Sequence, residues 1–285
     1  MLDLTSPAVV KELMQRYQKR FKKSLGQNFL IDSDVLDAIV EKSGIDKDTA
    51  VLEIGPGIGA LTMYLSQAAK KVVAVEIDGG LIPLLGETLQ GCDNVELVNA
   101  DILQTDIASL IEQKLSGAQK VKVAANLPYY ITTPILFKLL EYRAQINSIT
   151  VMVQKEVAER IVAPSGGKDY GALTVAVQFY AKPQIIYNVP AHSFMPMPKV
   201  DSAVIRLDIL DKPAVDVSDQ KLFFRVVRAA FAHRRKTFVN SASAEGFNKE
   251  AMANILQQCD FPADIRGERF SLQDFAKITE KLIKN

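Results

Sequence analysis

The stretch VLEIGPGIGALT, at residues 51–62, joins an apolar strand to the start of a helix. The loop between them holds Gly55, Gly57 and Gly59, followed by Ala60. Glycine lets a backbone turn sharply and come close to a ligand, so the loop predicts a nucleotide-binding turn after a buried strand. With Ala60 the spacing also satisfies the relaxed dinucleotide-binding pattern, so the loop alone does not choose the class of cofactor.

Short apolar segments rich in β-branched residues recur along the chain and alternate with segments of helical spacing. Strands that are buried on both faces have this nearly continuous apolar character. The alternation therefore predicts an α/β fold, a doubly wound and mostly parallel sheet with helices on both faces. We expect strands at 50–54, 71–77, 94–100, 121–126 and 149–154, with later strands at 184–189 and 203–210 after a longer connection.

The pattern changes after residue 210. A linker at 211–219 is followed by helical segments at 220–242, 249–259 and 271–284. We therefore expect a cofactor-binding catalytic domain over residues 1–210 and a small all-helical domain over residues 211–285.

Basic residues gather in two of these segments. The N-terminal stretch KELMQRYQKRFKK (11–23), which we expect to be helical, holds six basic residues and one acid. The helix expected at 220–242 has five basic residues between positions 225 and 236, interleaved with phenylalanines. Either could be a solvated helix face, but basic stripes with aromatic residues favour contact with an RNA backbone. The residues expected to contact RNA are Lys22, Lys23, Arg225, Arg228, Arg234, Arg235 and Lys236.

The composition limits the other classes. The formal net charge of the 285 residues is +1, so a nucleic acid would be held by local patches and not by a global field. The chain has two cysteines and two histidines, without metal-ligand spacing, so we expect no metal site. We see no signal peptide and no apolar run of the roughly 20 residues that span a bilayer, and we expect a soluble cytoplasmic protein.

Carboxylates follow the expected strands at the spacing of a nucleoside site. Glu76 ends the second strand, where it can accept both hydroxyls of a ribose. Glu53 precedes the glycines and suits a cationic amino-acid end, while Asp101 and Ile102 follow the third strand and suit an adenine ring. Taken singly, Glu53 or Asp101 could equally cap a helix. Together they favour S-adenosylmethionine, and an NAD-dependent dehydrogenase remains an alternative that rests on the glycine loop alone.

The stretch AANLPYYITTP, at residues 124–134, ends the fourth strand. The amide oxygen of Asn126 and the carbonyl of Leu127 can accept both protons of an exocyclic amine, and Pro128 fixes the backbone that aims them. Tyr129 offers a flat face to a base. Such an arrangement grips an aromatic amine for methyl transfer by positioning and dipoles, without a strong base. The alternative is a turn that only ends a strand.

Seven motifs carry a resemblance that spans nearly the whole chain. In this order they resemble the motifs of the KsgA (RsmA) family of bacterial small-subunit rRNA adenine dimethyltransferases. They are QNFL (27–30), EIGPGIGALT (53–62), VEID (75–78), NADIL (99–103), NLPYYITTPIL (126–136), FMPMPKVDSAV (194–204) and FAHRRKTFVNS (231–241).

The resemblance implies a Rossmann-like class I methyltransferase domain, S-adenosylmethionine as methyl donor and a helical domain that binds RNA. The implied substrate is a pair of adjacent adenosines in the 3′-terminal hairpin loop of 16S rRNA, each methylated twice at N6 in the 30S subunit or its precursor. We expect a monomer. Phe194 would cover the target adenine opposite Tyr129. The residues implied to contact the cofactor are Asn28, Leu30, Gly55, Glu76, Asp101 and Asn126.

Two further alternatives share these features. The related Erm-type enzymes dimethylate an adenosine of 23S rRNA on the same fold, although FMPMPKVDSAV and FAHRRK favour the small-subunit enzyme. An assembly factor for immature 30S subunits, with methylation as a release step, would carry the same basic patches. The glycine-rich loop at 164–171 could close over RNA through Lys168 and Tyr170, or be a plain surface loop.

Overall fold

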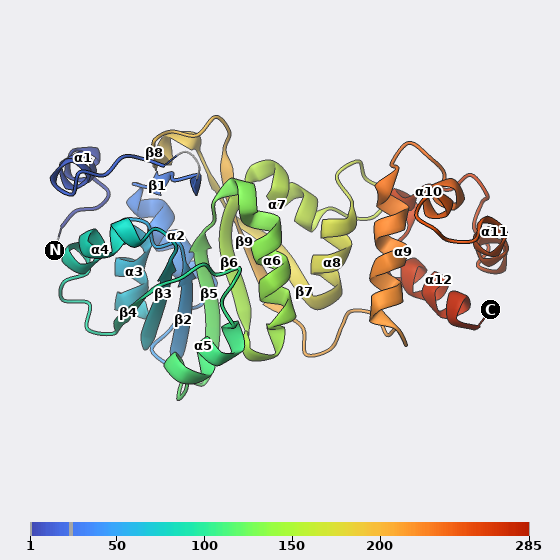
Figure 1. The fold of residues 1–285 in the computed structure, drawn as a ribbon, viewed down its shortest axis with the longest axis horizontal. Coiled ribbons are helices and arrows are strands. Elements are labelled where there is room, and N and C mark those ends of the chain that lie inside the picture. Colours follow the sequence, from blue (N-terminus) through green and yellow to red (C-terminus); the bar gives the residue numbers. More distant parts are fainter. Residues whose placement is uncertain (1, 23–24, 285) are drawn as a thin grey trace. The chain divides into compact units, whose positions relative to one another are not determined.

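The computed structural model describes residues 2–22 and 25–284 and contains the predicted α/β sheet (Figure 1). The predicted strands are confirmed, with ends that differ by at most three residues, and helices lie on both faces of the sheet (Figure 1). In spatial order the strands are β4 (Val95–Asn99), β3 (Lys71–Glu76), β2 (Thr49–Ile54), β5 (Lys120–Asn126), β6 (Ser148–Gln154), β9 (Ser202–Ile209) and β7 (Ala181–Val189).

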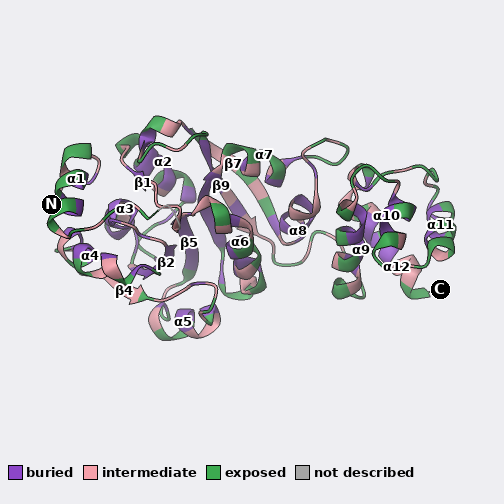
Figure 2. Cartoon of the chain, turned by 45° about the horizontal axis from the view of Figure 1, so that its top comes forward, coloured by how far each residue is buried: buried purple, intermediate pink, exposed green. Residues whose placement is uncertain are grey.

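The order of the strands reverses between β2 and β5, and this reversal is where open α/β sheets bind ligands. Strands β2 to β6 are parallel, and Ile54 pairs with Val75 on one side and Ala125 on the other. Glu76 and Asn126 each follow those partners by one residue. All of β2 is buried (Figure 2), so the polar groups at its carboxyl end are held on a rigid support.

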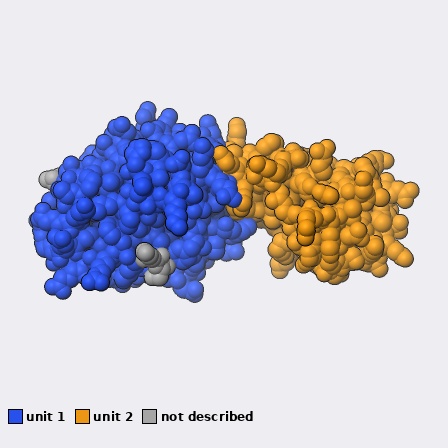
Figure 3. Space-filling model, turned by 90° about the horizontal axis from the view of Figure 1, so that it is seen from above, with its two compact units in different colours: residues 1–158, 184–209 blue, residues 159–183, 210–285 orange. Residues whose placement is uncertain are grey.

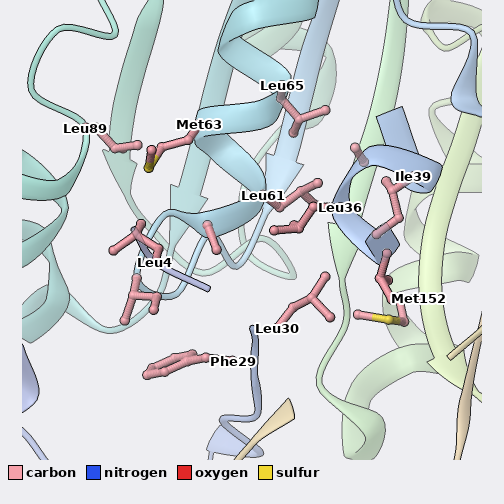
Figure 4. Close-up of a cluster of buried hydrophobic side chains, with 14 of the residues drawn as sticks. Leu4, Phe29, Leu30, Leu36, Ile39, Leu61, Met63, Leu65, Leu89 and Met152 are labelled. Atoms are coloured by element: carbon pink, nitrogen blue, oxygen red, sulfur yellow. The ribbon is translucent and has the colours of Figure 1, made fainter. Parts of the chain in front are cut away.

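The core on one face of the sheet forms around helices α2 (Ser33–Ser43), α3 (Ala60–Ala68) and α4 (Ile82–Thr88). Apolar residues at helical spacing turn inward from these helices, and Figure 4 shows Leu30, Leu36, Leu61 and Met152 gathered in this cluster. The remaining helices of this part are α1 (Pro7–Arg16), α5 (Ile107–Lys114) and α6 (Thr132–Glu141).

A second, two-stranded sheet escaped prediction. Strand β1 (Phe29–Leu30) pairs antiparallel with β8 (Phe194–Met195), so that Leu30 faces Phe194. Two-residue strands carry no periodic signal, and their pairing depends on segments that are far apart in the chain. The pairing brings the motifs QNFL and FMPMP side by side.

The N-terminal basic segment is only partly helical, against expectation. Helix α1 ends at Arg16, and Gln18 adopts a left-handed φ of 52°. The N–H of Lys19 donates back to the carbonyl oxygen of Met14, which closes the helix in the manner of a left-handed cap. Residues 19–22 therefore leave the helix.

The chain divides into two compact units, residues 1–158 with 184–209 and residues 159–183 with 210–285 (Figure 3). One boundary between the units falls at residue 210, and residues 159–183, which we expected in the first domain, belong to the second unit. The reason is aromatic packing, since the ring of Phe179 lies 4.8 Å from that of Phe223, and Tyr170 lies 5.8 Å from Phe231.

The second unit is helical, as predicted, but its first expected helix is broken. The Thr237 side chain accepts the N–H of Asn240 and begins a new helix, while Ser241 donates to the carbonyl of Ala229. Arg234, Arg235 and Lys236 therefore lie in a turn. Helix α7 (Lys155–Val162) leads into this unit, and the other helices are α8 (Ala172–Tyr180), α9 (Gln220–Ala232), α10 (Phe238–Ala244), α11 (Lys249–Gln258) and α12 (Leu272–Lys284).

None of the helices in the described ranges has the length and apolar character needed to cross a membrane.

Candidate cofactor and substrate site

A pocket lies at the carboxyl ends of β2, β3 and β5. Four segments line it, namely residues 25–30, the glycine loop at 53–61, residues 76–77 and residues 126–131. The structure thus brings together most of the site residues expected from the sequence: Asn28, Leu30, Glu53, Gly55, Gly57, Glu76, Asn126, Leu127, Pro128 and Tyr129. Of the others, Asp101, Ile102 and Phe194 lie outside the set of described residues that line this pocket.

The glycine loop depends on the absence of side chains. Gly55 and Gly57 have φ values of 69° and 61°, which other residues rarely adopt. A Cβ at Gly57 would lie 3.0 Å from the ring of Phe29, whereas a Cβ at Gly55 would meet open space. The backbone at Gly55 is therefore accessible to a ligand in the pocket.

Glu53 is a buried carboxyl, and one of its two oxygens lacks a partner among the described residues. Its side chain is 1% exposed, and Oε2 has no hydrogen-bond partner among the described residues. Burial raises the pKa of Glu53 from 4.5 to about 8; the interaction with the Thr62 hydroxyl opposes the rise, and the charge of Glu76 adds to it. The carboxyl is therefore largely neutral at pH 7 in this state, and a cation entering the pocket would favour its ionised form.

Glu76 is held between the loop and the turn that follows β3. Its two oxygens accept the N–H of Gly57 at 3.2 Å and the N–H of Asp78 at 2.8 Å. Burial raises the pKa of Glu76, and these hydrogen bonds oppose the rise. The carboxylate is thereby fixed at the pocket wall.

The next carboxyl, Asp78, has charged and polar partners. Lys22 Nζ lies 2.8 Å from its Oδ1, and Gln27 Nε2 donates to its Oδ2 at 3.2 Å. Burial acts to raise the pKa of Asp78, but the hydrogen bonds from Lys22 and the other donors outweigh it and lower the pKa. Lys22, expected to contact RNA, thus pairs with Asp78 within the protein. Lys23 lies outside the described residues.

Asn126 is oriented by a segment that is distant in sequence. Its Nδ2 donates to the carbonyl oxygen of Asn28 at 3.0 Å, so the amide nitrogen is engaged and Oδ1 is the acceptor end of the side chain. The N–H of Leu127 donates to Met152, and the carbonyl of Pro128 accepts from Ile131 and Thr132. Asn126 Oδ1 is therefore one acceptor that this strand end can offer to the pocket.

Tyr129 is half-buried and anchored by its hydroxyl, which shares a 2.7 Å hydrogen bond with Ser202 Oγ. Burial raises the pKa of Tyr129. Phe194 is 3% exposed and belongs to the hydrophobic core beside Leu30. Its expected place over the adenine remains a prediction, and it requires the ring to turn out of the core.

The segment after β4 is self-contained. Asp101 Oδ1 accepts the N–H of Leu103 at 2.8 Å, as a cap does, and Ile102 is buried. Their expected contacts with an adenine ring also remain predictions. Sequence reasoning missed Leu25, Gly26, Ile77 and Tyr130 in the pocket wall, although the conspicuous pair of adjacent tyrosines could have indicated Tyr130.

Some basic residues of the second unit already interact with other groups of the protein. Arg234 donates to the carbonyls of Lys168 and Tyr170, and Arg225 lies 4.4 Å from the ring centre of Phe247. Tyr170 is buried, so it is unavailable to RNA in this conformation. The five residues of this unit that we expected to contact RNA are all exposed, namely Arg225, Arg228, Arg234, Arg235 and Lys236.

Metal ligands do not cluster in the described part of the chain, where no group of three or more His, Cys, Asp or Glu side chains could hold an ion.

Comparisons with known proteins agree with this geometry. Residues 18–283 match the family model of the ribosomal RNA adenine dimethylases. A protein of Alkaliphilus oremlandii named ribosomal RNA small subunit methyltransferase A is 47% identical over 99% of this chain and 98% of its own length. One of the same name from Clostridioides difficile is 48% identical over 97% and 96%.

Solved structures show the same fold. A dimethyladenosine transferase from Plasmodium falciparum has a TM-score of 0.75 at 27% identity, covering 90% of this chain and 98% of that one. The 23S rRNA methyltransferase ErmE has a TM-score of 0.67 at 26% identity, covering 90% and 100%. Both solved structures are methyltransferases, and the second is named for a ribosomal RNA substrate.

Proposed function

Because the chain belongs to the ribosomal RNA adenine dimethylase family, we propose that it methylates N6 of two adjacent adenosines in the 3′-terminal hairpin loop of 16S rRNA. Two transfers to each base give N6,N6-dimethyladenosine. The observation that carries the proposal is Asn126, whose amide is oriented by the carbonyl of Asn28 so that Oδ1 is left as an acceptor in the pocket. The small-subunit relatives at 47–48% identity support 16S rRNA over 23S rRNA.

The residues in the pocket fit S-adenosylmethionine as donor. Glu53 Oε2 is a buried acceptor that suits a cationic group, and the open space at Gly55 admits a ligand close to the backbone. The fixed carboxylate of Glu76 suits ribose hydroxyls. When bound, S-adenosylmethionine supplies an electrophilic methyl group.

The carboxyl end of β5 positions the amino group of the adenine. The N6 amino nitrogen of adenine is a poor nucleophile because its lone pair is delocalised into the ring. Hydrogen bonds from the two N6 protons to Asn126 Oδ1 and to the carbonyl of Leu127 favour a more pyramidal nitrogen. The alkylated nitrogen is acidic and releases its proton readily, so positioning and directed dipoles suffice. Tyr129 stacks on the base that has left its own stack, and an unpaired loop base makes that step least costly.

The partner we propose is the 30S subunit or its precursor in the cytoplasm, bound by a monomer. Exposed basic side chains of the second unit, such as Arg228 and Arg235, would contact RNA phosphates. Since the formal net charge is only +1, these local patches must supply the attraction.

The test is transfer of labelled methyl from S-adenosylmethionine to unmethylated 30S subunits, with 23S rRNA in parallel. We expect label on N6 of 16S adenines, two methyls per base. Asn126→Ala should slow transfer about 100-fold or more, since it removes an oriented dipole at the reacting nitrogen. Asn240→Ala, an exposed asparagine of α10, is the matched control and should leave the rate unchanged.

Other outcomes would point elsewhere. Label on 23S rRNA alone would indicate an enzyme of the ErmE kind, which the structural likeness keeps as the second candidate. Cofactor binding without transfer to either RNA would contradict the proposal and favour an assembly factor.

A further inference from the structure

We propose that Ser202 is a positioning residue, which holds the Tyr129 ring in place through the hydrogen bond between their hydroxyls. The inference rests on the proposed function, in which the Tyr129 ring stacks on the target base. The two side chains come from segments 73 residues apart, and their oxygens are 2.7 Å apart.

The topology explains why a residue of β9 reaches the site. Strands β5 and β6 run parallel and end at Asn126 and Gln154, whereas β9 is antiparallel to β6, so its first residue, Ser202, pairs with Gln154. An antiparallel strand thus places its beginning at the sheet edge where the parallel strands end. The serine hydroxyl is thereby placed at the same edge as the turn that carries Tyr129.

The serine is a firm support. Ser202 is fully buried, and the backbone before it is tied, because the carbonyl of Asp201 accepts the N–H of Lys155 at 3.0 Å. The Asp201 carboxylate also accepts the N–H of Ala191 at 3.0 Å. A hydroxyl on a strand fixed in this way cannot follow the tyrosine, so the bond restrains the ring and not the strand.

The ring itself needs such a restraint. Tyr129 lies in a short 3₁₀ turn, Tyr129–Ile131, none of whose residues is fully buried, and the neighbouring Tyr130 is 56% exposed. Packing alone therefore holds this turn weakly. A hydrogen bond between half-buried and buried hydroxyls is directional, and losing it frees the aromatic side chain to rotate. The chemistry we propose depends on an adenine that stacks on a fixed Tyr129 ring. A more mobile ring should therefore lower the rate of methyl transfer.

A double-mutant cycle tests the pair. Ser202→Ala and Tyr129→Phe each remove one hydroxyl and leave the ring, and each should lower kcat about 3- to 10-fold with little change in KM for S-adenosylmethionine. Because both act on the same bond, Ser202→Ala with Tyr129→Phe should be no slower than either alone. Independent, multiplying losses would overturn the proposal.

A matched control separates positioning from the general cost of losing a buried hydroxyl. Ser148 lies at the far end of the neighbouring strand β6, is 2% exposed, and has no hydrogen-bond partner for Oγ among the described residues. Ser148→Ala should leave kcat unchanged. An equal loss of kcat in Ser148→Ala would show that the effect of Ser202→Ala is merely structural.

A second readout does not require methyl transfer. In the unliganded protein with labelled tyrosine rings, NMR should show a shifted and more mobile Tyr129 ring in Ser202→Ala and the native signal in Ser148→Ala. An unchanged Tyr129 signal would overturn the inference whatever the enzyme's activity. Failure of the wild-type protein to methylate RNA, with the ring signal altered as expected, would instead contradict the proposed function alone.

Discussion

Glu53 and Asp78 are both buried, yet their charge states differ. Glu53 is 1% exposed, and burial raises its pKa to about 8. Asp78 is 6% exposed, but Lys22 and the other donors lower its pKa despite burial. Lys22 and the other donors therefore keep Asp78 ionised against the cost of its burial, whereas Glu53 is more deeply buried and lacks a charged partner of opposite sign. Asp78 binds the N-terminal segment through Lys22 and Gln27, and Glu53 Oε2 is available to a cationic ligand.

The largest expected effect on stability is that of Glu53→Gln. The folded protein keeps a proton on Glu53 up to about pH 8, whereas the unfolded chain loses it near the ordinary pKa of 4.5. Wild-type stability should therefore fall as the pH rises through this window. The glutamine amide does not titrate, so it has no cost of staying protonated above pH 4.5. At pH 8 the Glu53→Gln variant should therefore be more stable than the wild type by a few kcal/mol, and this difference should vanish toward about pH 5.

Urea unfolding of the unliganded protein at several pH values measures this difference. Glu41→Gln, which changes an exposed carboxyl of α2, should leave the profile parallel to the wild type. Parallel profiles for Glu53→Gln as well would contradict the assignment of Glu53 as a neutral buried acid.

Asp78→Asn should have the opposite pH dependence and a smaller effect. At pH 7 the amide loses the charge-assisted bonds from Lys22 and Gln27, at a cost of about 2 kcal/mol. The wild-type advantage exists above the unfolded pKa of 3.8 and disappears as the pH falls through the lower folded value. Unfolding at pH 7 and in acid measures it, and an advantage that grew on acidification would refute the ion pair.

Lys22→Met should cost less still, below about 1 kcal/mol, because the lysine side chain is 50% exposed and water screens the pair. The loss should shrink in high salt. Since Gln27, which donates to Asp78, and Asn28 line the pocket, KM for S-adenosylmethionine should rise.

Steady-state kinetics with both substrates separates the two roles of Lys22. A higher KM for RNA with unchanged KM for the methyl donor would instead support the RNA contact expected from the sequence. Lys42→Met, an exposed lysine of α2, is the control.

The smallest effect on stability should be that of Arg228→Ala, within about 0.5 kcal/mol, because an exposed charge has neither a burial cost nor a fixed partner to lose. RNA binding should nevertheless weaken, with the salt slope of the affinity reduced by about 1. Fluorescence anisotropy over a salt series measures this, and an unchanged slope would remove Arg228 from the RNA surface.

The fold was predictable because its signals are local. Each buried strand of the main sheet is a short apolar run, and the glycines at 55 and 57 indicate a loop whose backbone adopts positive φ values. The second unit was predictable as helical, but not its contents. Residues 159–183 join the second unit through the packing of Phe179 on Phe223. No local sequence pattern predicts that contact.

The sequence by itself determined the parallel sheet, the glycine loop and the presence of Glu53, Glu76 and Asn126 at strand ends, since alternation and spacing are written along the chain. Only the tertiary structure decided the states of these groups. The carbonyl of Asn28 orients Asn126, Lys22 pairs with Asp78, and Ser202 anchors Tyr129. Each of these bonds joins segments 56 to 98 residues apart, and such contacts exist only once the sheet has brought its edges together.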